Sequence, residues 1–540
     1  MNCTLRRTVC IAAIVATVAV AAAGIHANRG FYHDDAYISL RYARNLVAGH
    51  GLVWNPGERV EGYSNFLFTL LAAALGAARV NLVTASRVIN ASAFAALAMF
   101  LWFQGAKLAG GNLLQRPLGA IAFIMVLASF PMIAWVFGGL EGPLFTALSV
   151  SGIWLFRSSI GRTHATRTLV LSGVLLGLAC MTRMDGLLFA GVSAVFLVLE
   201  QGPVQSRFTR LGVFLTALAA VLLPYHIWRY SYYGSPLPNT FWVKAAGFSW
   251  IRIRWGLRYV LSSATVPPFT FLLAGAALFF AASRRALDRS AAYLLAILAS
   301  YASFIVYVGG CQMPAYRLTL PLIPVAALLL AALLARSGPR LATPVRCAVV
   351  ACIVLLLALQ TQDGRVNPRR TNPAAFVGTI VGKYIDANWP PGALVALHTA
   401  GSTPFYAGDL RFIDMLGLND AHIARRVITS RELPWQKVPG HLKGDGAYVL
   451  SRKPDYIILG PAEGTTIETP WFLSGLEMSR DPRFEANYSV RQVDLDVSDQ
   501  KNFQHYGATR TGVMTFTYYE RRSRPADREP GTRHEAPSSS

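Results

Sequence analysis

Two adjacent carboxylates, Asp34 and Asp35, stand just past the first apolar run of the chain, residues 8–24. With His33 they would lie where a membrane-crossing helix emerges into water. A carboxylate there can orient or deprotonate an acceptor hydroxyl, and carboxylate oxygens also suit a divalent cation such as Mg, Mn or Ca. Apolar residues then recur every three or four positions, which predicts an amphipathic helix. The stretch 31–46 is therefore either an active-site entrance or a charged loop flanking the first helix.

Arginines at three other places could meet an anion. Arg41 follows the two carboxylates, and Arg183 belongs to Thr-Arg-Met-Asp-Gly at 182–186. Arg317 stands at a predicted helix start, where the helix dipole disfavours a cation and an anionic partner is favoured. Arg183 could equally form a structural ion pair with Asp185.

More polar candidates occupy the loops between apolar runs. Glu141 precedes Pro143 and could act as a helix cap or as a site residue. The sequence predicts five substrate-binding residues in such loops besides His33: Glu61, Glu141, Asp185, Asn239 and Tyr316.

The composition excludes a soluble enzyme. The chain has 540 residues, 53% of them hydrophobic, and a mean hydropathy of +0.39. Many apolar runs approach 20 residues, the length that crosses ~30 Å of hydrocarbon. The net charge of +22 does not indicate nucleic-acid binding, because only seven of the 50 basic residues are lysines and arginines gather between apolar runs. The six cysteines show no metal-ligand spacing. The fold class predicted is a polytopic α-helical membrane protein.

The positive-inside rule sets the topology. After the first run, apolar runs occupy residues 64–78, 84–104, 118–136, 143–156, 168–181, 187–199, 211–228, 266–282, 290–308, 318–335 and 343–360. Five basic clusters, near 107–116, 157–167, 207–210, 284–289 and 336–346, all become cytoplasmic if 64–78 does not cross. That run is short for a span. We therefore predict about 11 transmembrane helices within 1–360, with an outer loop at 28–83 that carries the Asp-Asp motif.

Beyond residue 360 the hydrophobicity falls and the periods shorten. A helix is predicted over 376–387, and strands are predicted at 393–397, 411–415, 455–459 and 514–519. Residues 361–520 are thus expected to form an extracytoplasmic α/β domain, a normal domain size. The tail 521–540 is expected to be disordered.

Seven motifs in order resemble one family. They are Asp-Asp-Ala-Tyr-Ile-Ser-Leu-Arg-Tyr-Ala (34–43), Gly-His-Gly-Leu-Val-Trp-Asn-Pro-Gly-Glu-Arg-Val-Glu-Gly-Tyr-Ser-Asn-Phe-Leu (49–67), Gly-Leu-Glu-Gly-Pro-Leu-Phe (139–145), Thr-Arg-Met-Asp-Gly (182–186), Leu-Pro-Asn-Thr-Phe (237–241), Gly-Gly-Cys-Gln-Met-Pro-Ala-Tyr-Arg (309–317) and Ile-Asp-Met-Leu-Gly-Leu-Asn-Asp (413–420). The set resembles the GT-C glycosyltransferases, in particular the terminal arabinofuranosyltransferases of mycobacterial cell-wall arabinan and the related pilin arabinosyltransferases. One departure is Gly-Gly-Cys-Gln, where the family leads us to expect an acidic residue after the glycines.

The resemblance implies a polyprenyl-phosphate donor of D-arabinofuranose and a glycan or pilin acceptor. It also implies an inner-membrane enzyme with its active site on the extracytoplasmic side. Asp34 or Asp35 would be the catalytic carboxylate, and Arg317, Arg183 and Arg41 would bind the donor phosphate. Whether the anomeric configuration is inverted or retained stays open.

Three alternatives stay open as well, of which the third is a non-catalytic subunit of envelope assembly that would not need Asp34 or Asp35. The first is a GT-C enzyme that transfers another sugar, such as mannose. The second is a transporter of lipid-linked sugars, although a transporter more often places its charges near the bilayer midplane.

Overall fold

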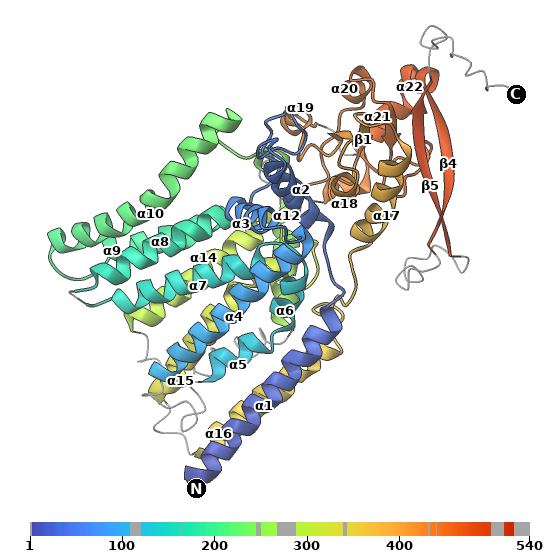
Figure 1. Ribbon diagram of the computed structural model, residues 1–540. Helices are drawn as coiled ribbons and strands as arrows, with labels where there is room; N and C mark the ends of the chain where they lie inside the picture. The colour runs from blue at the N-terminus through green and yellow to red at the C-terminus, as the bar shows by residue number, and fades with distance from the viewer. Residues whose placement is uncertain are drawn as a thin grey trace, which may run out of the picture. The chain divides into compact units, whose positions relative to one another are not determined.

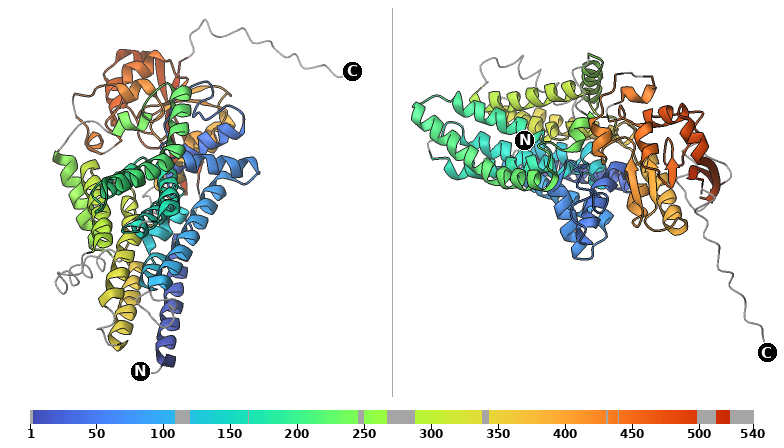
Figure 2. Two further views of the ribbon diagram at one scale, coloured as in Figure 1. Left: turned by 90° about the vertical axis from the view of Figure 1, so that its left-hand side faces the viewer. Right: turned by 90° about the horizontal axis from the view of Figure 1, so that it is seen from above.

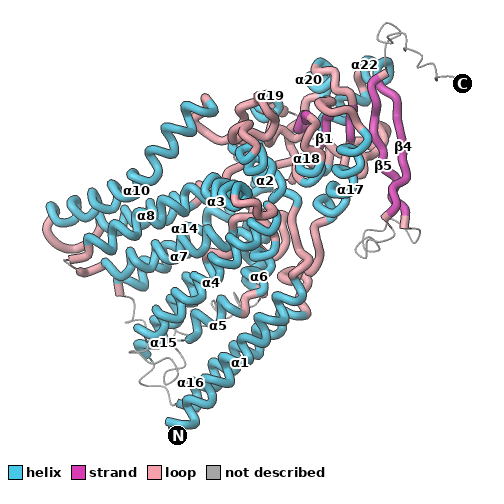
Figure 3. The backbone as a smooth tube through the Cα atoms, viewed as in Figure 1, coloured by secondary structure: helices cyan, strands magenta, loops and turns pink. Residues whose placement is uncertain are grey.

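The computed structural model describes residues 3–108, 120–162, 164–244, 250–266, 288–337, 343–429, 432–438, 440–497 and 512–522. The chain forms two compact units, residues 1–376 and 377–540. The first unit is α-helical and the second contains a β-sheet (Figure 3). The predicted tail falls outside the described residues from 523 onward.

The helices of the first unit run mostly side by side (Figures 1 and 2). They are α1 (Cys3–Asn28), α2 (Asp34–Val47), α3 (Phe66–Ala77), α4 (Leu82–Leu108), α5 (Ile121–Leu127), α6 (Phe130–Phe137), α7 (Gly142–Ser159), α8 (Thr166–Thr182), α9 (Gly186–Val198), α10 (Val204–Tyr233), α11 (Asn239–Lys244), α12 (Trp250–Ala264), α14 (Arg289–Val308), α15 (Leu322–Ser337) and α16 (Thr343–Ala358). Short 3-10 turns lie at Arg317–Thr319 and Leu359–Thr361.

Within the described ranges, four helices are long and apolar enough to cross a membrane: α1, α4, α10 and α14. The predicted count of about 11 is therefore not confirmed, because several predicted runs form shorter helices. Helix α3, in the run 64–78, has 12 residues and rises about 18 Å, less than a span needs. The predicted run 266–282 lies almost wholly outside the described residues.

The predicted run 118–136 contains a break between α5 and α6. Pro131 at the start of α6 cannot continue a helix from α5, because it lacks an N–H. The buried Gln360 side chain satisfies the backbone at the break. Its amide donates to the Ala128 carbonyl and its oxygen accepts from the Phe130 N–H, each at 3.0 Å.

Basic residues meet at one end of the helices. Arg210, on α10, donates to the Ser159 carbonyl at 2.7 Å and the Arg162 carbonyl at 3.1 Å, and pairs with Glu200 at 3.1 Å. Arg289 at the start of α14 donates to the Leu199 carbonyl. Members of three predicted basic clusters thus share one end of the first unit. Their location in the cytoplasm stays a prediction.

The first unit ends later than the predicted boundary at residue 360, because the segment 361–376 is bonded to it. The Ala315 N–H donates to the Arg365 carbonyl at 3.0 Å, and the Asn372 N–H donates to the Tyr32 carbonyl at 2.8 Å. This segment leads into α17 (Pro373–Asn388), within which the division between the units falls.

The second unit is built on a five-stranded sheet in the order β2-β1-β3-β5-β4. Strands β1 (Leu394–Leu397), β2 (Arg411–Asp414) and β3 (Tyr456–Ile458) are parallel, whereas β5 (Val513–Arg521) pairs antiparallel with β3 and with β4 (Tyr488–Asp496). The helices are α18 (Ser402–Tyr406), α19 (Ala421–Arg425), α20 (Gly446–Ser451), α21 (Leu473–Ser479) and α22 (Pro482–Asn487), with a 3-10 turn at Pro434–Lys437. The core includes Ile413, Val449, Ile457 and Met478. The sheet domain is thus confirmed, and β4 is a strand that the sequence did not predict.

Candidate active site

Four charged side chains from separate helix ends form one connected network. Glu141 precedes α7, and instead of capping that helix its Oε1 accepts from Arg183 Nη1 at 3.0 Å and from Arg317 Nη2. Arg183 at the end of α8 also binds Asp185 at the start of α9, through Nε at 3.0 Å and Nη2 at 2.9 Å. We call Glu141, Arg183, Asp185 and Arg317 the Glu141 cluster.

The charges within the Glu141 cluster balance, two positive against two negative. Burial opposes ionisation of Glu141, but the Arg317 and Arg183 charges outweigh it and lower the pKa of Glu141 to about 2. Glu141 is therefore an ionised and fully paired carboxylate at neutral pH, and a weak base.

One donor in the Glu141 cluster is unused. Arg317 donates through Nη2 to Glu141 and through Nη1 to the Met313 sulfur. Its buried Nε has no hydrogen-bond partner among the residues that the structure describes. A buried donor without a partner is costly, and such groups call for a specific explanation. An anion bound at Arg317 Nε would supply one.

A buried asparagine joins the Glu141 cluster to α2. Asn65, at the start of α3, donates to Glu141 Oε2 at 2.9 Å. Its own oxygen accepts from Ser39 on α2 at 2.9 Å and from Thr69 at 3.1 Å. The helix that begins with Asp34 is therefore held to the cluster through hydrogen bonds of a single side chain.

His33 approaches the same place from the start of α2. Its ring lies 5.9 Å from the Trp135 ring, and the Arg317 guanidinium lies 5.5 Å from that ring as well. Burial lowers the pKa of His33; Asp35 raises it and Arg317 lowers it further. A neutral imidazole is thus favoured next to the cationic Arg317.

The two predicted catalytic carboxylates differ in exposure. Asp34 is 7% exposed at the first turn of α2, whereas the Asp35 side chain is 37% exposed, with an oxygen 3.8 Å from His33 Nδ1. Both adjoin His33, so the predicted entrance and the Glu141 cluster belong to one region of the first unit.

Arg41, by contrast, stands on α2, and its side chain packs against the loop that follows this helix. Its side chain is wholly buried, its Nε donates to the Trp54 carbonyl at 2.7 Å, and its guanidinium lies over the Trp54 ring. These contacts hold the loop together. Arg41 thus has a structural role in this loop, and its contact with the donor phosphate stays a prediction.

The remaining predicted residues form separate contacts. Glu61 binds Arg229 Nε at 2.6 Å, and the Asn239 N–H donates to the Glu61 carbonyl at 2.9 Å, which ties the segment between α2 and α3 to the end of α10. The Tyr316 hydroxyl shares a hydrogen bond with the Ser262 hydroxyl at 2.7 Å. The Tyr316 backbone lies in the left-handed region, at φ 44°.

An apolar pocket of about 800 Å³ lies between α9 and α14. Asp185 lines it where α9 begins, and farther along it is lined by apolar residues such as Val192 and Phe304. The Tyr301 hydroxyl on α14 donates to Asp185 at 2.7 Å. The pocket therefore joins apolar helix surface to the charged Glu141 cluster.

No group of three or more His, Cys, Asp or Glu side chains with metal-binding geometry occurs in the described part of the chain. His33 lies beside Asp34 and Asp35, but the three side chains as placed do not form such a ligand set. The divalent cation stays a prediction.

Sequence reasoning did not single out Asn65, Trp135 or Tyr301. Asn65 stands inside the quoted motif at 49–67, so its place there was a usable signal. Trp135 and Tyr301 lie within apolar runs, where an aromatic residue reads as ordinary core.

Comparison with known proteins gives matches in both units. Residues 369–516 match the family described as "Domain of unknown function (DUF8728)". The terminal β-(1→2)-arabinofuranosyltransferase of Mycobacterium tuberculosis is 28% identical over 246 residues, covering 43% of this chain and 37% of that protein. Its counterpart in Corynebacterium glutamicum is 29% identical over 266 residues, covering 43% and 36%. This chain thus spans little more than a third of the length of either relative.

A solved structure shows the fold. ArnT from Cupriavidus metallidurans, crystallised with undecaprenyl phosphate, superposes with a TM-score of 0.52 at 12% identity, covering 74% of this chain and 85% of ArnT. The chain therefore has the GT-C fold that its motifs predicted, and it is similar in sequence to the terminal β-(1→2)-arabinofuranosyltransferases.

Proposed function

We propose that this chain is a membrane glycosyltransferase that transfers D-arabinofuranose from a polyprenyl-phosphate donor to a glycan or pilin acceptor. The observation that carries the proposal is the unpartnered Nε of Arg317, buried in a charge-balanced cluster that an apolar pocket adjoins. The sugar and the donor lipid are supported by the names of the similar proteins and by the undecaprenyl phosphate in the ArnT crystals.

The donor phosphate is bound by Arg317 and Arg183, and part of the prenyl chain lies in the α9–α14 pocket. When the sugar leaves, the phosphate diester becomes a monoester and gains negative charge. Arg317 Nε donates to that charge, because no group in the described part of the chain occupies this donor. Glu141 keeps both guanidinium groups in place without blocking Nε.

The acceptor hydroxyl is oriented or deprotonated by Asp34 or Asp35. Glu141 is unsuited to this task, since its low pKa makes it a poor base. The more exposed Asp35 is open to solvent, whereas Asp34 is nearly enclosed. Both carboxylates remain candidates.

The test is sugar transfer by the purified full chain in lipid nanodiscs, with synthetic polyprenyl-phospho-arabinofuranose and an arabinofuranosyl oligosaccharide acceptor. Mass spectrometry of the acceptor shows whether one pentose has been added. Asp34→Asn and Asp35→Asn are compared at equal expression, and transfer should fall at least 100-fold in one of them.

Polyprenyl-phospho-mannose and a flux assay for lipid-linked sugar serve as comparisons. Transfer of mannose instead of arabinofuranose would overturn the sugar assignment. Lipid-linked sugar crossing the bilayer without any transfer would replace the enzyme by a transporter.

A further inference from the structure

We propose a second lipid site, distinct from the α9–α14 pocket: a groove between α1, α4 and α6 binds one anionic phospholipid of the bilayer. One acyl chain lies along the groove and the phosphate meets Arg87. The site goes beyond the proposed function, since it concerns a bilayer lipid and not the donor.

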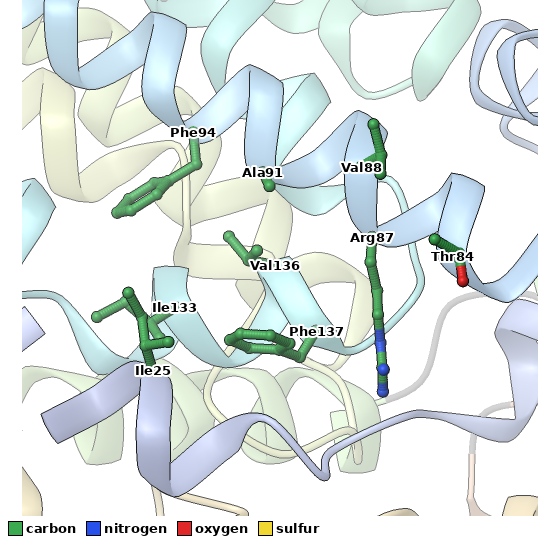
Figure 4. A pocket seen from close by; sticks show the side chains of 9 residues that line it. All are labelled: Ile25, Thr84, Arg87, Val88, Ala91, Phe94, Ile133, Val136 and Phe137. Atoms are coloured by element: carbon green, nitrogen blue, oxygen red, sulfur yellow. The ribbon is translucent and has the colours of Figure 1, made fainter. Parts of the chain in front are cut away.

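The groove is apolar along its length and cationic at one end. It encloses about 300 Å³ between Ile25 of α1, Ala91 and Phe94 of α4, and Ile133 and Phe137 of α6. Figure 4 shows Arg87 and Thr84 together toward one end, with Phe94 and Ile133 toward the other. This order of groups matches a lipid with a charged head and an apolar chain.

Arg87 has unused capacity for an anion. Its Nη2 makes a long contact of 3.5 Å with the Phe31 carbonyl, and its guanidinium lies 5.3 Å from the centre of the Tyr32 ring. Its Nε is buried without a hydrogen-bond partner, and within the described residues no carboxylate forms an ion pair with it. A phosphate at this place would neutralise the Arg87 charge and accept a hydrogen bond from its Nε–H.

The size of the groove favours an acyl chain over a prenyl chain. Thr84 and Phe94 are ten residues apart on α4, or about 15 Å along the helix axis. This length equals the hydrocarbon depth of one leaflet, half of ~30 Å. The α9–α14 pocket, at about 800 Å³, is the larger of the two and better suited to a long polyprenyl chain.

A lipid bound in this groove would affect the stretch 31–46, the predicted active-site entrance. Phe31 and Tyr32, which Arg87 contacts, directly precede His33 and Asp34. Tyr32 also bonds Ser86 on α4 at 3.0 Å. A lipid phosphate on Arg87 would therefore hold α4 and the start of α2 in a fixed relation.

The experiment measures lipids retained by the purified full chain. Native mass spectrometry follows the binding of phosphatidylglycerol and of phosphatidylcholine, which has no net charge. Arg87→Gln removes the charge, Arg87→Lys keeps it, and Ala91→Trp fills the groove. Met99→Trp is the matched control, because Met99 lies on the same helix, is 58% exposed and does not line the groove.

We expect wild type to prefer phosphatidylglycerol at least tenfold, with one lipid per chain. Arg87→Gln and Ala91→Trp should lose that preference, while Arg87→Lys and Met99→Trp keep it. Equal binding of both phospholipids by wild type, or unchanged preference in Arg87→Gln, would overturn the proposal. Displacement of phosphatidylglycerol by an equimolar amount of undecaprenyl phosphate would overturn it in favour of a prenyl lipid. Because the readout is binding, it does not depend on sugar transfer.

Discussion

Arg317→Lys tests whether the free Nε of this arginine stabilises the leaving phosphate. Lysine keeps the positive charge and can still pair with Glu141, so the Glu141 cluster stays neutral. What is lost is the Nε–H of the guanidinium, a second donor that is held in a fixed direction. Removing one donor that is aimed at developing negative charge lowers kcat by about 10²–10³, or roughly 2.7–4 kcal/mol. We expect a loss in this range, with the KM for the donor changed by less than about threefold, since the lost interaction strengthens in the transition state.

The assay is the initial rate of pentose transfer at several donor concentrations, with thermal unfolding measured on the same preparations. Arg365→Lys is the matched control, because Arg365 is half exposed and pairs with Asp363 at the surface. Such a pair contributes little to stability, about 0–1 kcal/mol. If Arg317→Lys keeps more than about a third of the wild-type kcat, the free Nε has no role in the chemistry. A raised KM with unchanged kcat would likewise refute the reasoning, because it indicates ground-state binding only.

Of Asp34→Asn and Asp35→Asn, one should lower kcat at least 100-fold with little change in melting temperature; similar small losses in both would exclude a base on α2. Gly191→Trp, whose side chain would project into open space lining the α9–α14 pocket, should raise the donor KM at least tenfold, whereas Met99→Trp should not. The pKa of Glu141 is depressed from 4.5 to about 2, so its ion pairs contribute about 3 kcal/mol above pH 4.5 that is lost as the pH falls from 4.5 toward 2. The melting temperatures of wild type and Glu141→Gln should therefore converge between pH 7 and pH 3, and parallel curves would contradict the assigned ion pairs.

Local patterns explain which parts of the fold the sequence could predict. Strands β1, β2 and β3 are short apolar runs next to turn residues, and each lies within a residue or two of its predicted position. Strand β4 carries the polar sequence Tyr-Ser-Val-Arg-Gln-Val-Asp-Leu-Asp, and most of its residues are at least partly exposed. It forms through nine paired positions with β5, a long-range contact that its own composition does not indicate.

The break between α5 and α6 shows a similar limit. Pro131 is a local signal that a helix begins there. The group that makes the break tolerable, however, is Gln360, which lies 230 residues away from Phe130 in the chain. A hydropathy run from 118 to 136 therefore reads as one span, while the folded chain supports two short helices with a satisfied gap.

The site illustrates how far residue types alone can lead. Sequence reasoning named Glu141, Arg183, Asp185 and Arg317 as separate loop residues, and all but Arg317 had a structural interpretation beside the functional one. The structure joins them across 176 residues, and the pairing removes Glu141 from the set of possible bases, since both of its oxygens are occupied and its charge is needed to hold two arginines. A general base must then come from a carboxylate outside the cluster. Two predicted carboxylates, Asp34 and Asp35, directly follow His33. The His33 ring and the Arg317 guanidinium both lie near the Trp135 ring. We therefore assign the leaving phosphate to the arginines and the acceptor to Asp34 or Asp35, because the Glu141 charge is already neutralised by its two arginine partners.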